Sequence, residues 1–129
     1  YTEVDTLSLH DALPISEIAK PLLKPLLTIS NRDFKEKYGH VSGSWRGKKP
    51  IQRNAIIALA HYKDETALPD LISVMENDVR PVIRGTAAWA LGKIGGTDAE
   101  EALQAFLEKE KDEEVISEIH KGLEMISAN

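Results

Sequence analysis

The stretch PVIRGTAAWALGKI, residues 81–94, decides the fold of this chain. Its apolar side chains recur at intervals of four, three, one and three residues, which places them on one stripe of an α-helix. They are Ile83, Ala87, Ala90, Leu91 and Ile94. The proline at the start fits the first turn of a helix, where a missing N–H costs nothing. The many small residues predict a helix that its neighbours approach closely and bury from two sides.

The same stripe occurs three times, at a period of thirty-two residues. The earlier copy is Ile51, Ala55, Ala58, Leu59 and Tyr62, and the later copy is Val115, Ile119, Gly122, Leu123 and Ile126. A second stripe lies between successive copies, first as Ala67, Leu71, Val74 and Met75 and then as Ala99, Leu103, Phe106 and Leu107. Residues 50–129 are therefore predicted to form two helical hairpins and a closing helix.

This period predicts an all-α fold, a short α-solenoid of HEAT-like helical hairpins. One hairpin cannot cover its own apolar face, so each repeat buries the face of its neighbour. The motif R-x-x-A-x-x-A-L-G, from Arg84 to Gly92, is similar to that of short HEAT-like repeats. In the first repeat Arg53 stands one place out of step, and in the third Ser117 replaces the arginine. Tetratricopeptide repeats would run nearer about 34 residues, with a different aromatic pattern.

Turn and cap signals agree with these helices. Pro50 and Pro81 are each expected to open a helix. The glycine pair at residues 95–96 ends one helix, after which Thr97 or Asp98 is expected to cap the next.

Residues 17–49 do not follow the period. The stretch KPLLKPLLTIS is expected to form a short helix that packs on something apolar. Its leucines are predicted to be exposed in this chain and to favour self-association. The stretch SNRDFKEKYG predicts a helix with Ser30 as its cap, Asp33 three residues on, and Gly39 as its stop. A loop rich in glycine and serine follows, from His40 to Pro50.

This loop and the helix after it supply the candidate binding residues. They are Trp45, Arg46, Lys48, Lys49 and Arg53. Lysine and arginine neutralise phosphates, and an aromatic face can stack on a base or sugar. The other interpretation is that Trp45 anchors the loop and the cations are merely solvated, and both stay open. The net charge of −5 is unevenly spread, with bases in excess over residues 32–53 and acids in excess from residue 96 onward.

Other chemistry has little support. The chain has no cysteine, which excludes disulfides, thiolate zinc sites and cysteine-ligated clusters within it. The four histidines are scattered, and the sequence contains no phosphate-binding loop or nucleophile motif. An aspartate–arginine bond across a turn is the favoured role of Asp78 and Arg84, ahead of nucleic-acid binding. No apolar run approaches the roughly 20 residues of a membrane span. We expect no catalysis by this chain alone.

A joined pattern carries a more specific resemblance. It runs through Ser30 to Phe34, then Gly43-Ser44 with Arg46, then Arg53-Asn54, and continues into the repeats. From about Glu17 to its end, the chain resembles the C-terminal part of bacterial epoxyqueuosine reductases. The resemblance implies a longer cytoplasmic oxidoreductase that uses cobalamin and 4Fe-4S clusters to reduce epoxyqueuosine to queuosine in tRNA.

The resemblance also implies that catalysis and tRNA binding reside in different parts of the longer protein. The catalytic half lies upstream and is missing here, so this chain itself holds no cofactor and no catalytic residue. Its repeats are expected to help hold tRNA, with Trp45, Arg46, Lys48, Lys49 and Arg53 nearest the RNA. The alternative is a stand-alone HEAT-like module that binds protein through a repeat face.

The first residues are expected to be foreign to the rest. The stretch TLSLHDALPI, residues 6–15, is similar, residue for residue, to a translated sequencing-library adapter. We therefore expect three parts: a non-native segment over 1–16, connecting helices and a basic loop over 17–49, and the HEAT-like repeat domain over 50–129.

Overall fold

A computed structural model of the chain describes residues 23–38 and 48–128, and every regular element in those two ranges is helical. The short helices are η2 (Lys24–Thr28) and η4 (Glu65–Ala67), both of 3₁₀ type. The α-helices are α3 (Asn31–Tyr38), α4 (Lys48–His61), α5 (Leu68–Asn77), α6 (Pro81–Ile94), α7 (Thr97–Lys109) and α8 (Glu113–Ala128). The predicted all-α fold is confirmed. The adapter-like segment over 1–16 lies outside the described residues.

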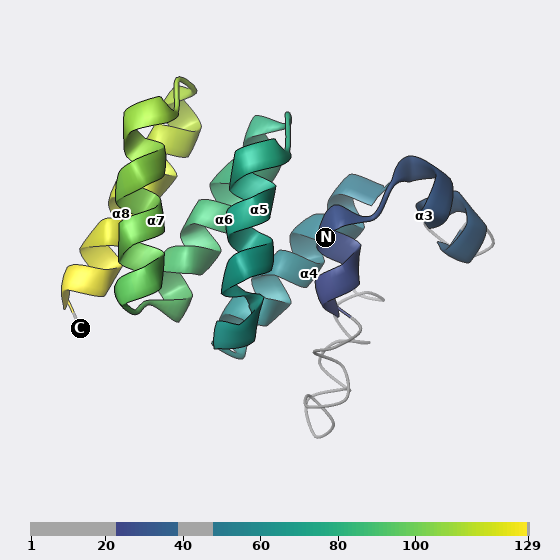
Figure 1. Cartoon of the computed structure of the whole chain (residues 1–129), viewed down its shortest axis with the longest axis horizontal. Helices are drawn as coiled ribbons and strands as arrows, with labels where there is room; N and C mark the ends of the chain where they lie inside the picture. The colour runs from purple at the N-terminus through teal and green to yellow at the C-terminus, as the bar shows by residue number, and fades with distance from the viewer. Residues whose placement is uncertain (1–22, 39–47, 129) are drawn as a thin grey trace.

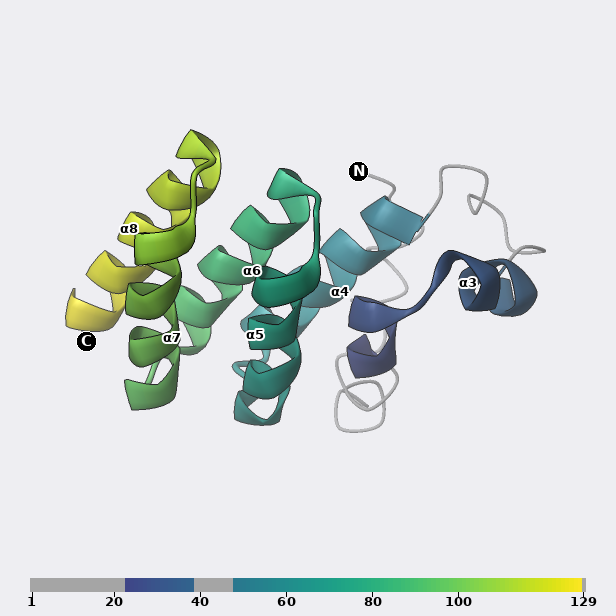
Figure 2. The same ribbon diagram turned by 45° about the horizontal axis from the view of Figure 1, so that its top comes forward.

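The helices form two layers (Figures 1 and 2). α4, α6 and α8 lie side by side in one layer, while η2, α5 and α7 cover them on one side. The predicted thirty-two-residue spacing is observed, because Ala58 of α4 and Ala90 of α6 occupy equivalent buried places. α7 packs against α6 and α8, the first helices of two successive repeats, while α5 packs against α6 and η2. Each repeat thus covers the apolar face of its neighbour.

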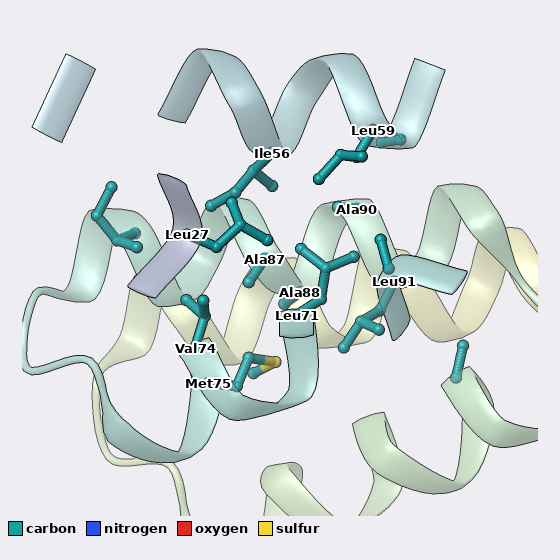
Figure 3. Packing of buried hydrophobic residues seen from close by; sticks show 14 of the residues in the cluster. Leu27, Ile56, Leu59, Leu71, Val74, Met75, Ala87, Ala88, Ala90 and Leu91 are labelled. Atoms are coloured by element: carbon teal, nitrogen blue, oxygen red, sulfur yellow. The ribbon is translucent and has the colours of Figure 1, made fainter. Parts of the chain in front are cut away.

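The core runs through the stacked repeats without a break. The equivalent residues Leu59 and Leu91 are both fully buried, as are Leu71 and Leu103 in the partner layer. Figure 3 shows Ile56 and Leu59 of α4 facing Ala87, Ala90 and Leu91 of α6.

The leucines of the η2 segment belong to this same core. Leu23 and Leu27 are only 8% and 2% exposed, and Leu27 lies among residues of α4, α5 and α6 (Figure 3). Lys24 Nζ also donates a hydrogen bond to Thr66 Oγ1 at 2.7 Å. The expected packing on an apolar surface is confirmed. The expected exposure of these leucines is wrong for Leu23 and Leu27, because the first repeat itself covers them, whereas the expected self-association stays a prediction.

A close backbone approach joins α6 to α8. Gly92 and Gly122 lie against each other, and a Cβ on Gly92 would overlap the Cα of Gly122 and lie 3.0 Å from its carbonyl oxygen. A Cβ on Gly122 would lie 3.2 Å from the carbonyl oxygen of Ala88. Gly122, the position where the repeated stripe lacks an apolar side chain, is therefore the place where two backbones touch.

The helix ends follow the expected signals with two exceptions. Ser30 Oγ accepts a hydrogen bond from the Asp33 backbone N–H at 3.1 Å, as predicted, while Gly39 lies outside the described residues. Pro81 opens α6, but α4 begins two residues before Pro50. Gly96 is the N-cap of α7, with φ 95°, so neither Thr97 nor Asp98 caps that helix. The glycine reaches a backbone conformation that other residues avoid, and both predicted caps lie inside the first turn.

Candidate nucleic-acid interface

The five candidate binding residues fall in two groups. Trp45 and Arg46 lie outside the described residues, so the structure does not place them. Lys48, Lys49 and Arg53 lie on the first two turns of α4. Lys49 and Arg53 are four residues apart on one face of the helix, and both side chains are exposed. Neither has an ion pair or hydrogen bond within the described part of the chain, which leaves both cations available to a ligand.

Lys48 has a different environment. Its Nζ donates a hydrogen bond to the backbone carbonyl of Ile29 at 2.8 Å, and the residue is half-buried. Lys48 therefore ties the first turn of α4 to the end of η2. Of the three described candidates, only Lys49 and Arg53 have the exposure that a phosphate contact requires.

Gln52, which the sequence did not single out, anchors the first repeat. It is 1% exposed, and its Nε2 donates to the carbonyl oxygens of Leu26 and Leu27 at 2.9 and 3.4 Å. Its Oε1 accepts a hydrogen bond from Arg80 Nη2. Arg80 in turn holds both carboxylate oxygens of Asp78, through Nε at 2.9 Å and Nη2 at 2.7 Å. A buried amide satisfied in this way fixes η2 and the α5–α6 turn to α4.

Arg84 takes the same place one period after Gln52. Its Nε and Nη2 donate to the two carboxylate oxygens of Glu110 at 3.0 and 2.9 Å, and its Nη1 donates to the backbone carbonyl of Asp78 at 3.1 Å. Arg84 thus makes the expected bond to Asp78, but to its backbone carbonyl, while Arg80 holds the Asp78 carboxylate across the same turn. The residue equivalent to Arg84 in the first repeat is Gln52, which explains why Arg53 stands one place out of step and faces outward instead. In the third repeat the equivalent residue is Ile116, so Ser117 does not take the place of the arginine.

These pairs shift pKa values in opposite senses. The hydrogen bonds from Arg84 hold the pKa of Glu110 below its ordinary value, against the effect of burial. Burial alone would raise the pKa of Asp78, but the hydrogen bonds and the charge of Arg80 outweigh it, so this pKa is also lowered. Glu110 raises the pKa of Arg84 by accepting its hydrogen bonds. All four groups are charged at neutral pH and hold the repeats together.

The described residues offer little for other chemistry. Within residues 23–38 and 48–128, no group of three or more histidine, aspartate and glutamate side chains is placed to hold a metal ion. None of the helices in these ranges combines the length and the apolar character that a bilayer span requires.

Comparison with known proteins supports the architecture. The sequence model for HEAT repeats matches residues 47–124. The chain belongs to the HEAT-repeat family. Its HEAT repeats also have close relatives of known name. The epoxyqueuosine reductase of Bacillus subtilis strain 168 is 70% identical over 116 residues, which is 90% of this chain and 30% of that protein. The chain is also 70% identical to an uncharacterized protein in the gldA 3′ region of Geobacillus stearothermophilus, over 89% of this chain and 53% of that protein.

Solved structures agree with these relatives. A crystal structure of epoxyqueuosine reductase with a tRNA-Tyr epoxyqueuosine-modified stem loop has a TM-score of 0.79 and 70% sequence identity to this chain. The match covers 81% of this chain and 28% of that one. The chain thus spans about a third of the length of most epoxyqueuosine reductases it matches, and corresponds to their C-terminal part. The resemblance to the C-terminal repeat region of these reductases is confirmed.

Proposed function

We propose that this chain is the tRNA-contacting HEAT-repeat module of an epoxyqueuosine reductase, whose catalytic part lies outside the chain. The observation that carries the proposal is the 70% identity to a reductase whose structure contains a tRNA stem loop. Two exposed cations on α4, Lys49 and Arg53, have no ion pair within the described residues and supply the charge that such a ligand needs. We extend the proposed site to Trp45 and Arg46, which precede them in the chain, and give Lys48 a supporting role through its bond to Ile29.

The proposal assigns the chemistry to the remainder of the longer protein. That protein would reduce epoxyqueuosine to queuosine in tRNA, in the cytoplasm, with cobalamin and 4Fe-4S clusters. The residues of this chain do not fit a cysteine-ligated cluster, because the sequence has no cysteine. We also propose that the chain has the three parts expected from its sequence: a non-native segment over 1–16, connecting helices and a basic loop over 17–49, and the repeat domain over 50–129.

Charge reversal at Lys49 and Arg53 tests the proposal. In the full-length protein that carries this segment, Lys49→Glu with Arg53→Glu is expected to weaken binding of a tRNA anticodon stem loop. Two lost phosphate contacts should also flatten the plot of log affinity against log salt by roughly one to two in slope. Affinity measured at several salt concentrations gives both quantities.

A matched control uses two exposed lysines at the far ends of α4 and α6, away from Lys49 and Arg53. Lys63 follows α4 and Lys93 lies in the last turn of α6, and neither has a partner within the described residues. Lys63→Glu with Lys93→Glu makes the same change in net charge and should leave affinity and slope close to the native values. If both double variants weakened RNA binding equally, the loss would come from the change in net charge alone, and this would contradict a local site.

A further inference from the structure

The side chains on the outer face of the α4, α6 and α8 layer change in chemical character from one helix to the next. This face lies opposite the core residues and away from α5 and α7 (Figures 1 and 2). Lys49 and Arg53 make it basic on α4, Val82 and Trp89 make it apolar on α6, and α8 makes it acidic. The acidic side chains on α8 are Glu113, Glu114 and Glu118.

A groove of about 320 Å³ lies on this face between α6 and α8. Val82 and Trp89 line its α6 side, and Glu114, Glu118 and Lys121 line its α8 side. Trp89 is half-buried and packs in part against the core, while Val82 is 44% exposed. The groove therefore pairs an aromatic ring with two carboxylates, of which Glu118 also contacts Lys121 at 3.4 Å.

The groove is open because Gly85 has no side chain. A Cβ on Gly85 would lie 3.6 Å from Cγ of Glu118, which is an ordinary contact, so packing does not require glycine there. The equivalent residue on α4 is Arg53, and on α8 it is Ser117. A larger side chain at position 85 would meet no clash at its Cβ and would occupy part of the groove that Gly85 lines.

We infer that this groove is a subsite for an unpaired RNA base, which stacks on Trp89 while its amino groups face Glu114 and Glu118. The inference rests on the proposed function, because the RNA that brings the base is the one bound by Lys49 and Arg53. Proteins recognise single-stranded RNA by stacking splayed bases on aromatic rings and by hydrogen bonding their edges. Adjacent packed helices are roughly 8–10 Å apart, so phosphates on α4 and a base beyond α6 can belong to one strand.

Charge complementarity favours this orientation of the strand. Phosphates are attracted to the cations of α4 and repelled by the carboxylates of α8, whereas base amino groups are hydrogen-bond donors that carboxylates accept. The acidic side chains of α8 thus favour binding of the base and repel the RNA phosphates.

The test uses the full-length protein and two RNA probes: a hairpin with unpaired loop bases and a blunt duplex with the same number of phosphates. Trp89→Leu is expected to weaken hairpin binding by roughly five- to a hundredfold, the range for removing an aromatic stacking partner. Duplex affinity and the salt slope should stay unchanged, because no phosphate contact is lost. Trp89→Phe should recover most of the hairpin affinity.

Gly85→Leu provides a second variant that keeps Trp89 and fills the groove. It should weaken hairpin binding in the same selective way, and it tests the subsite even where Trp89→Leu lowers stability. Unchanged hairpin affinity in Gly85→Leu, or an equal loss for hairpin and duplex, overturns the subsite. If Lys49→Glu with Arg53→Glu still weakens hairpin binding in that case, the proposed function stands without it. If neither change affects RNA binding, the proposed function fails as well.

Discussion

Replacing Gly92 with alanine is expected to destabilise this chain by about 3 kcal/mol, the upper end of the usual cost of overpacking a core. The added methyl group would overlap the Cα of Gly122 and press on its carbonyl oxygen. Backbone atoms cannot move aside as a flexible side chain can, so α6 and α8 must separate and give up packing along their whole contact. Urea unfolding measures the change as a lower midpoint at an unchanged m-value.

Gly85→Ala is the matched control for this prediction. Both glycines are buried on α6, and the substitution is the same, but a Cβ at position 85 meets only ordinary contacts. Alanine is favoured over glycine within a helix by roughly 1 kcal/mol, so Gly85→Ala should leave stability unchanged or raise it. A similar loss from both variants would show that the helix crossing tolerates neither change and that close backbone approach is not the reason.

The sequence predicts the core of this fold because the buried positions are apolar at regular intervals along the chain. The stripes at Ala58 and Ala90 recur at a fixed spacing since each repeat uses its neighbour to cover the same face. Small residues on α6 predicted close helix approach, and the contact of Gly92 with Gly122 confirms it. The buried leucines Leu23 and Leu27 fall outside the period, so nothing in the pattern shows which surface covers them.

The polar interactions are harder to predict from the sequence. Gln52 and Arg53 are adjacent, and only the helix orientation makes the glutamine the buried partner of Arg80 and leaves the arginine outside. A glutamine serves here because its amide both donates and accepts, which composition alone does not reveal. Trp89 lies within a helix predicted to be buried from two sides, yet it lines an open groove because of the glycine at position 85.

Glu110→Gln is expected to destabilise the chain by about 3 kcal/mol at neutral pH, the lower end of the cost of breaking a buried ion pair. The substitution keeps the size of the side chain and removes the charge that Arg84 contacts through two hydrogen bonds. The two side chains are only 16% and 10% exposed, so water does not replace the lost partner well. The free energy of unfolding at pH 7 is compared with that of Glu108→Gln, a substitution of an exposed carboxylate in the last turn of α7, which should have little effect.

The same pair predicts how this loss depends on pH. The pKa of Glu110 is lower in the folded chain than its unfolded value, so the charged carboxylate stabilises the fold fully above the unfolded pKa, near about 4.3. This stabilisation disappears as the pH falls through the folded pKa, where Glu110 takes up a proton and comes to resemble glutamine. The difference between the native chain and Glu110→Gln should therefore shrink below about pH 4. The titration of Asp78 is common to both proteins and cancels from the difference. A difference that stays constant into acid would mean that the loss comes from packing of the amide and not from the ion pair with Arg84.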